Sequence, residues 1–214
     1  MTQQPATGVP LVPPPRASTW NIANALTVLR LLMVPGFAYY LLQGDGRQTG
    51  SRIAAWGVFA VASYTDRIDG QLARSRNLVT PFGKLADPIA DKALTGTALV
   101  GLSLLGELPW LVTTVVMVRE VGVTLLRFWV IRHGVIPASR GGKLKTLLQG
   151  VAIGLYVLPL TGWPASARAV VMVAAVAVTV VTGVDYIARA VTLRQTSARA
   201  AMKRARRAAR VPRP

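Results

Sequence analysis

Apolar segments of about 20 residues recur along this chain and constrain its fold more than any other feature. A helix of that length crosses the hydrocarbon core of a bilayer, so the segments predict an all-α, polytopic membrane protein with six transmembrane helices. The expected spans cover residues 22–42, 53–73, 83–105, 108–131, 144–162 and 165–190. We expect one membrane domain over residues 21–193, between a disordered Pro-rich tail (1–20) and a basic tail (194–214).

The distribution of positive charge predicts how the chain is oriented. The protein has 25 Lys and Arg against 8 Asp and Glu. One set of segment ends is rich in Lys and Arg and includes the tail from Arg194, whereas the other set holds Arg47, Arg52 and Arg168. The positive-inside rule therefore places both termini in the cytosol. The basic tail has no aromatic residues, which favours anionic membrane lipids over nucleic acid as its partner.

Acidic residues are concentrated at one place. Four of the eight in the chain are Asp66, Asp69, Asp87 and Asp91. Asp66 and Asp69 have helical spacing and share one helix face, and so do Asp87 and Asp91. The short connection between the two segments predicts antiparallel helices with both pairs at the cytosolic end. Facing carboxylates repel one another unless cations intervene. Oxygen-only ligation suits Mg²⁺, Mn²⁺ or Ca²⁺ better than Zn²⁺, so the pattern predicts a site for one or two divalent ions.

The neighbours of these carboxylates indicate what such a metal site would bind. Gly70 leaves room for a ligand or a metal-bound phosphate, and Arg74 follows one turn later, where it can take a phosphate charge. The alternative to a metal site is a set of exposed acidic residues that form ion pairs with Arg67, Arg74 and Lys92. Gly, Ala and Arg at fixed offsets within the acidic spacing are hard to explain by ion pairing alone.

These residues carry a family resemblance. The pattern D-x2-D-G-x2-A-R-x8-G-x3-D-x3-D, filled at every fixed position from Asp66 to Asp91, resembles the signature of the CDP-alcohol phosphotransferases. Three further stretches are similar to the bacterial branch that makes phosphatidylglycerophosphate. They are residues 21–30 with Pro35, Arg119-Glu120 with Arg127, and residues 142–146 with Gln149. Ala23 departs from the usual Pro of that branch, outside the acidic core.

The resemblance implies a six-helix enzyme of the cytoplasmic membrane of a bacterium that acts as a homodimer. It would transfer the phosphatidyl group of CDP-diacylglycerol to glycerol 3-phosphate, release CMP, and use Mg²⁺ or Mn²⁺, with two ions expected. It implies that Asp91 is the general base for the acceptor hydroxyl. The implied metal ligands are Asp66, Asp69, Asp87 and Asp91. The implied CDP-diacylglycerol contacts are Asn24, Asp66, Asp69, Gly70, Arg74 and Thr80.

The acceptor is a small anion, and its phosphate needs a basic site next to Asp91. The candidates are Arg119, Arg127, Lys143 and Lys145. Arg119 and Arg127 lie about two helical turns apart and can face one cavity. Two alternatives remain open: Arg119 pairs with Glu120 or Asp185, and the two lysines only mark topology. Asp185 and Arg189 are expected to pair with each other or with another span.

Two other functions compete with this interpretation. Within the same chemistry the acceptor could be inositol phosphate, serine or phosphatidylglycerol, although the stretches 21–30 and 119–149 favour glycerol 3-phosphate. A divalent-cation transporter could also use clustered aspartates. Transporter sites usually lie near the bilayer midplane within repeated halves, whereas this chain shows no internal repeat and its acids lie near one membrane face.

Overall fold

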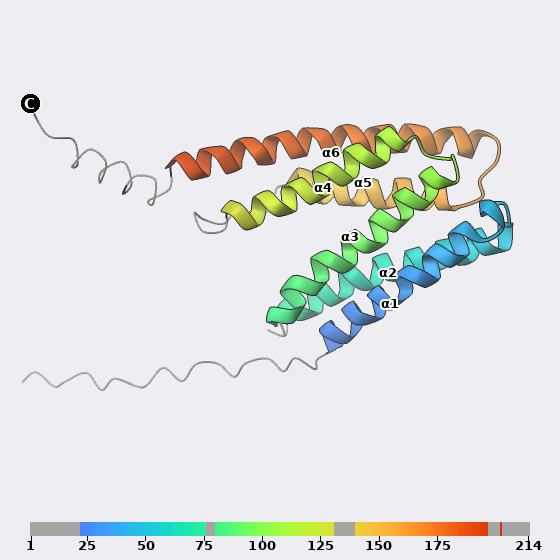
Figure 1. The fold of residues 1–214 in the computed structure, drawn as a ribbon, viewed down its shortest axis with the longest axis horizontal. Coiled ribbons are helices and arrows are strands. Elements are labelled where there is room, and N and C mark those ends of the chain that lie inside the picture. The colour runs from blue at the N-terminus through green and yellow to red at the C-terminus, as the bar shows by residue number, and fades with distance from the viewer. Residues whose placement is uncertain (1–21, 76–79, 131–139, 197–201, 203–214) are drawn as a thin grey trace, which may run out of the picture.

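In the computed structural model, which describes residues 22–75, 80–130, 140–196 and 202, all regular structure within these ranges is helical. Six α-helices run back and forth between two ends of the molecule (Figure 1). They are α1 (Ile22–Leu42), α2 (Thr49–Ser75), α3 (Pro81–Leu104), α4 (Trp110–Val130), α5 (Arg140–Val157) and α6 (Trp163–Thr196), with a short 3-10 turn η1 (Gln43–Gly46) after α1. The all-α prediction is therefore confirmed, with one helix for each predicted segment, although α5 ends at Val157, before the predicted end at residue 162.

Local sequence explains where several helices begin and end. Gly44, Asp45 and Gly46 have positive φ angles of 61°, 53° and 68°, and this left-handed turn reverses the chain between α1 and α2. At the other end of the molecule, Thr80 is the N-cap of α3 and Pro81 occupies its first turn. Pro is suited to that position because its fixed φ matches the helix and its missing N–H has no helical acceptor there.

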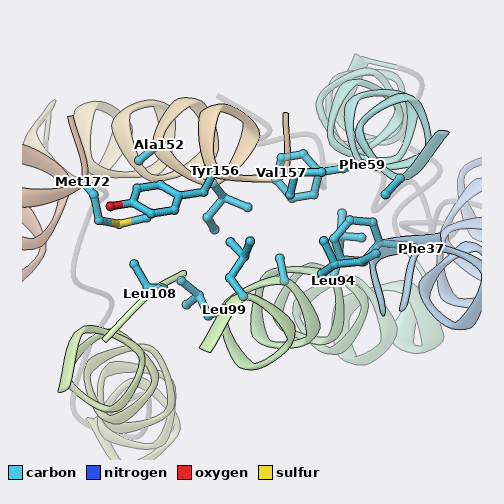
Figure 2. Close-up of a cluster of buried hydrophobic side chains, with 14 of the residues drawn as sticks. Phe37, Phe59, Leu94, Leu99, Leu108, Ala152, Tyr156, Val157 and Met172 are labelled. Atoms are coloured by element: carbon cyan, nitrogen blue, oxygen red, sulfur yellow. The ribbon is translucent and has the colours of Figure 1, made fainter. Parts of the chain in front are cut away.

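The helices pack in two groups. Helix α1 packs against α2 and α3, α6 packs against α4 and α5, and the groups meet mainly where α5 contacts α2 and α3 and where α3 contacts α4. Figure 1 shows α1–α3 on one side and α4–α6 on the other. Buried side chains from both groups fill the space between them (Figure 2), among them Phe37, Phe59, Leu99, Tyr156 and Met172.

The outer surface is strongly apolar. Every helix exposes large hydrophobic side chains, and on α4 Leu111, Val118 and Leu125 recur at seven-residue intervals, each more than 60% exposed. Contiguous apolar surface of this kind marks contact with membranes or partners. Two described stretches, Asn24–Gly46 and Trp163–Arg194, are long and apolar enough to cross a membrane. The surface is typical of a membrane protein.

A buried ion network ties the helix ends opposite the acidic motif. Arg52 of α2 is 2% exposed and donates hydrogen bonds to the backbone carbonyls of Tyr156 and Val157 and to the carboxylate of Glu107. Arg168 of α6 donates to the same carboxylate at 3.1 Å. Because a buried guanidinium requires its donors to be satisfied, these contacts fix α2, α5 and α6 together at this end.

Candidate active site

Three polar residues on the otherwise apolar helix α1 organise the acidic end of the molecule. Asn24, Thr27 and Arg30 follow one another at intervals of three residues and are all buried. That spacing keeps them near one face of the helix, and their contacts show that this face is directed at α2 and α3. Helix α1 therefore supports the two helices that carry the aspartates.

The first of these contacts fixes the start of α3. The Asn24 amide donates to Thr80 Oγ1 at 2.9 Å, and the Thr80 hydroxyl lies 3.0 Å from Asn24 Oδ1. Thr80 Oγ1 also accepts from the Gly83 N–H at 3.0 Å. A Cβ on Gly83 would lie only 2.9 Å from Asn24 Oδ1, so the glycine of the acidic pattern allows α3 to approach α1 closely. Asn24 and Thr80, two of the predicted CDP-diacylglycerol contacts, thus anchor the start of α3 to α1.

The next two contacts orient carboxylates. The Thr27 hydroxyl donates to Asp87 Oδ1 at 2.6 Å, and Arg30 Nη1 lies 2.5 Å from Asp66 Oδ1. Arg30 is 1% exposed whereas Asp66 is 38% exposed. The guanidinium therefore holds Asp66 from the protein side and leaves part of its carboxylate accessible to a ligand.

A cavity of about 130 Å³ is lined by residues of α2, α3, α4 and α5 and by Arg30 of α1. Asp66 on α2 and Asp91 on α3 both line it, so the fold brings together residues of the two halves of the acidic pattern. Further charged and amide side chains of the lining are mostly basic, and we call them the basic wall. They are Lys92, Glu120, Lys145 and Gln149.

Glu120 is the centre of this basic wall. Its carboxylate accepts from Lys92 Nζ at 3.0 Å and Arg119 Nη1 at 3.1 Å, and it also pairs with Lys145 Nζ. Glu120 is 8% and Lys145 7% exposed. One buried carboxylate thus holds three cations, which leaves a surplus of positive charge beside the cavity and suits an anionic ligand.

The four predicted acceptor residues are not equivalent in the structure. Lys145 lines the cavity, but Arg119, Arg127 and Lys143 do not. Arg119 pairs with Glu120, which is one of the two alternatives that the sequence left open, and donates to Thr182 Oγ1 at 3.1 Å. The exposed Arg127 lies in the last turn of α4, and Lys143 is exposed near the start of α5.

One further prediction is confirmed and another stays a prediction. Asp185 and Arg189 form an ion pair at 2.9 Å on α6, as expected from their spacing. Asp69, Gly70 and Arg74 belong to the last turns of α2, but the surroundings of these three residues lie outside the described part of the chain.

The donor set fits divalent cations in its chemistry. Asp66 and Asp91 line one cavity, and Asp87 lies one turn before Asp91 on α3. Carboxylate oxygens are the ligands that Mg²⁺ and Mn²⁺ prefer. Among the described side chains, no three His, Asp or Glu residues gather closely enough to hold an ion, and Asp69, the fourth member of the pattern, is not among them.

Sequence reasoning missed the roles of several residues in the site. Thr27 and Arg30 fall within a stretch that carries the family resemblance, but the sequence assigned no contact to them. Their signal is the spacing of polar residues along one face of an apolar helix. Lys92 was predicted only as a partner for exposed acids, and Glu120 only as a partner for Arg119. Their convergence with Lys145 joins three helices, which spacing along the chain does not reveal.

Comparison with known proteins identifies the class of this fold and site. Residues 20–181 match the CDP-alcohol phosphatidyltransferase family, and the chain belongs to that family of transferases. It is 59% identical over 175 residues to a probable phosphatidylglycerophosphate synthase of Mycobacterium tuberculosis strain H37Rv, covering 82% of this chain and 84% of the relative. These findings confirm the resemblance carried by the acidic pattern.

More distant relatives extend the same comparison. The chain is 35% identical over 185 residues to the CDP-diacylglycerol–glycerol-3-phosphate 3-phosphatidyltransferase of Bacillus subtilis, covering 79% of this chain and 95% of that one. It is 36% identical over 145 residues to the Rickettsia felis protein of the same name, covering 66% and 77% of the two chains. Family membership disfavours the cation-transporter alternative.

Proposed function

We propose that this protein transfers the phosphatidyl group of CDP-diacylglycerol to glycerol 3-phosphate, which gives phosphatidylglycerophosphate and CMP. The observation that carries the proposal is the cavity lined by Asp66, Asp91 and Lys145, in a chain related to proteins named for this reaction. Carboxylates suited to cations and a lysine suited to an anion thus line one cavity. The arrangement suits two phosphate-bearing substrates that must be brought together.

The reaction needs a base for the acceptor hydroxyl. The acceptor oxygen forms a bond to the phosphatidyl phosphorus, the bond from that phosphorus to the CMP oxygen breaks, and the hydroxyl proton must be removed. Asp91 lines the cavity and ends the acidic pattern, so we assign the proton to its carboxylate. Lys145 on the facing helix would hold the acceptor within reach of this group.

The carboxylates of Asp66, Asp69, Asp87 and Asp91 would hold the two Mg²⁺ or Mn²⁺ ions. When bound, such ions offset the charge of the pyrophosphate and stabilise the leaving CMP. The chain's own contribution is orientation: Thr27 holds Asp87 and Arg30 holds Asp66. Fixed carboxylates lose less entropy when a ligand binds, so α1 prepares the site before substrate arrives.

The nucleotide would lie at the starts of α1 and α3. Asn24 and Thr80 border this region through their mutual hydrogen bonds, and Gly70 and Arg74 would complete it from the end of α2. For the acceptor phosphate, Lys145 is the direct contact that the cavity supports best. Arg119 would act through Glu120.

The exposed cations complete the acceptor side. Arg127 and Lys143, at helix ends outside the cavity lining, would attract the acceptor anion towards the opening by long-range electrostatics.

Six membrane spans with both termini cytosolic are consistent with this arrangement. All six helices expose large apolar side chains, while α2, α3, α4 and α5 direct charged residues into the cavity, which is where a membrane protein tolerates them. The start of α1 and the end of α6 lie at the same end of the molecule (Figure 1). We further propose that the protein is a homodimer in a bacterial cytoplasmic membrane and that its basic tail contacts anionic lipids.

The direct test is an acceptor screen with the purified full chain. The protein in lipid nanodiscs receives CDP-diacylglycerol and Mg²⁺, and CMP release is measured with glycerol 3-phosphate, inositol phosphate, serine or phosphatidylglycerol. We expect release with glycerol 3-phosphate alone. Release only with inositol phosphate would overturn the acceptor assignment while keeping the chemistry, and absence of release with every acceptor would overturn the proposed activity.

Dependence on metal is tested in the same assay. We expect Asp69→Asn and Asp87→Asn to abolish activity while the helical circular dichroism spectrum is retained, because each removes a charged ligand. Activity of the parent should disappear in EDTA and return with Mg²⁺ or Mn²⁺. Undiminished turnover in EDTA would contradict the assignment of the aspartates as metal ligands.

A further inference from the structure

A buried amide in the cavity wall has a hydrogen-bonding group that the described protein does not use. Gln149 on α5 lines the cavity and is 6% exposed. Its Oε1 atom is buried, and among the described residues it has no hydrogen-bond partner. Buried polar side chains are almost always paired. An amide oxygen left in this state in the wall of a substrate cavity therefore points to a ligand.

The position of Gln149 relative to Lys145 indicates which part of a ligand it would meet. The two residues are i and i+4 on α5, so they share a helix face and are about 6 Å apart along the axis. Both line the cavity, which Asp91 also lines from α3. Because α5 starts at Arg140, Gln149 lies one turn farther from the acidic end of the bundle than Lys145 does. A three-carbon polyol phosphate is long enough to bridge this separation.

We infer that Gln149 is a specificity-determining residue that binds the non-reacting hydroxyl group of the acceptor. The inference rests on the proposed function and adds a hydroxyl subsite to it. With the acceptor phosphate at Lys145, the central hydroxyl donates to Gln149 Oε1, and the terminal hydroxyl is left to react. The terminal amide torsion of Gln is broad, so its oxygen can turn towards the ligand at little cost.

The contact between Gln149 and the central hydroxyl takes no part in the bonds that form and break during the transfer. The terminal hydroxyl oxygen forms the new bond to the phosphatidyl phosphorus, its proton passes to Asp91, and CMP leaves with the electron pair of the broken phosphorus–oxygen bond. The hydroxyl bound by Gln149 keeps its proton throughout. Gln149 thereby selects which acceptor oxygen reacts. It favours acceptors that carry a second hydroxyl on the carbon next to the reacting one.

The experiment compares two acceptors that differ only in this hydroxyl. Glycerol 3-phosphate is compared with 3-hydroxypropyl phosphate, which keeps the phosphate and one terminal hydroxyl but lacks the central one. The parent full chain in nanodiscs should show kcat/KM about tenfold higher for glycerol 3-phosphate, the value of one neutral hydrogen bond at the upper end of its range. In Gln149→Met, which has nearly the same shape without the amide, the ratio should fall to about one.

Thr146→Ala is the matched control. Thr146 lines the same cavity, but its hydroxyl already donates to the Gly142 carbonyl, so the ratio between acceptors should stay as in the parent. The thermal midpoint of unfolding of Gln149→Met should be no lower than that of the parent, because the substitution removes a buried oxygen without a described protein partner.

Three results separate the possible failures. Equal loss of kcat/KM for both acceptors in Gln149→Met would overturn the hydroxyl subsite and indicate a structural role. A parent that uses both acceptors equally would overturn it without any variant, even if Gln149→Met failed to fold. Absence of CMP release from the parent with glycerol 3-phosphate would instead overturn the proposed function on which the inference rests.

Discussion

Removal of the Glu120 carboxylate tests the physical account of the basic wall most directly. Glu120→Gln keeps the shape of the side chain but removes the charge that holds Lys92, Arg119 and Lys145 together. The three cations then repel one another without compensation. We expect a large loss of folding stability, caused mainly by the most buried of the three.

The magnitude follows from the burial of each partner. Lys92 has a side chain that is 26% exposed and can recover hydration, whereas the Lys145 side chain is 8% exposed and cannot. Breaking a buried ion pair by removing one partner costs about 3–5 kcal/mol, because the other charge is left uncompensated. The free energy of unfolding of Glu120→Gln should fall by this amount. Lys145→Met in the same background removes the orphaned cation, so the double variant should recover about 2–3 kcal/mol of the summed single losses.

The assay is a double-mutant cycle on the detergent-solubilised protein. Chemical unfolding is followed by circular dichroism for the parent, both single variants and the double variant. Arg189→Met serves as a control, since its pair with Asp185 is about half exposed and an exposed pair contributes at most about 1 kcal/mol. If the losses of Glu120→Gln and Lys145→Met simply add within about 0.5 kcal/mol, Glu120 is not the anchor of the basic wall.

Three further predictions concern the acidic and basic sides of the cavity. Thr27→Val removes a charge-assisted hydrogen bond to Asp87 that is worth about 1.5–3 kcal/mol. The Mg²⁺ concentration for half-maximal activity should therefore rise about tenfold or more. An unchanged metal titration would show that this bond does not orient the site. Asp91→Asn should lower kcat far more than it weakens CDP-diacylglycerol binding, measured by equilibrium titration, and the reverse pattern would make Asp91 a ligand only. Lys145→Ala should raise the KM for glycerol 3-phosphate by about one to two decades and leave the KM for CDP-diacylglycerol nearly unchanged. Arg127→Ala should raise the KM for glycerol 3-phosphate less, because Arg127 is exposed outside the cavity. Equal effects of the two variants would place the acceptor phosphate elsewhere.

The sequence by itself determined the helices and the nature of the acidic motif. Apolar length and turn residues such as Gly44 and Pro81 are local signals, and local signals determine where helices start and stop. The spacing within each pair of carboxylates, Asp66 with Asp69 and Asp87 with Asp91, is also local. Carboxylates one turn apart share a helix face whatever the rest of the fold does, so the amino-acid sequence alone is enough to group them and to indicate their family.

Only the tertiary structure decided which distant residues meet. That Arg30 faces Asp66, that Thr27 faces Asp87, and that Lys145 shares Glu120 with Lys92 depend on how the helices are rotated and packed against one another. Many positive residues near the ends of apolar segments look alike in sequence, because topology alone requires cations there. Packing distinguishes these cations. Lys145 is buried and lines the cavity together with Gln149, because it lies between the two groups of helices, whereas Arg127 and Lys143 stay exposed.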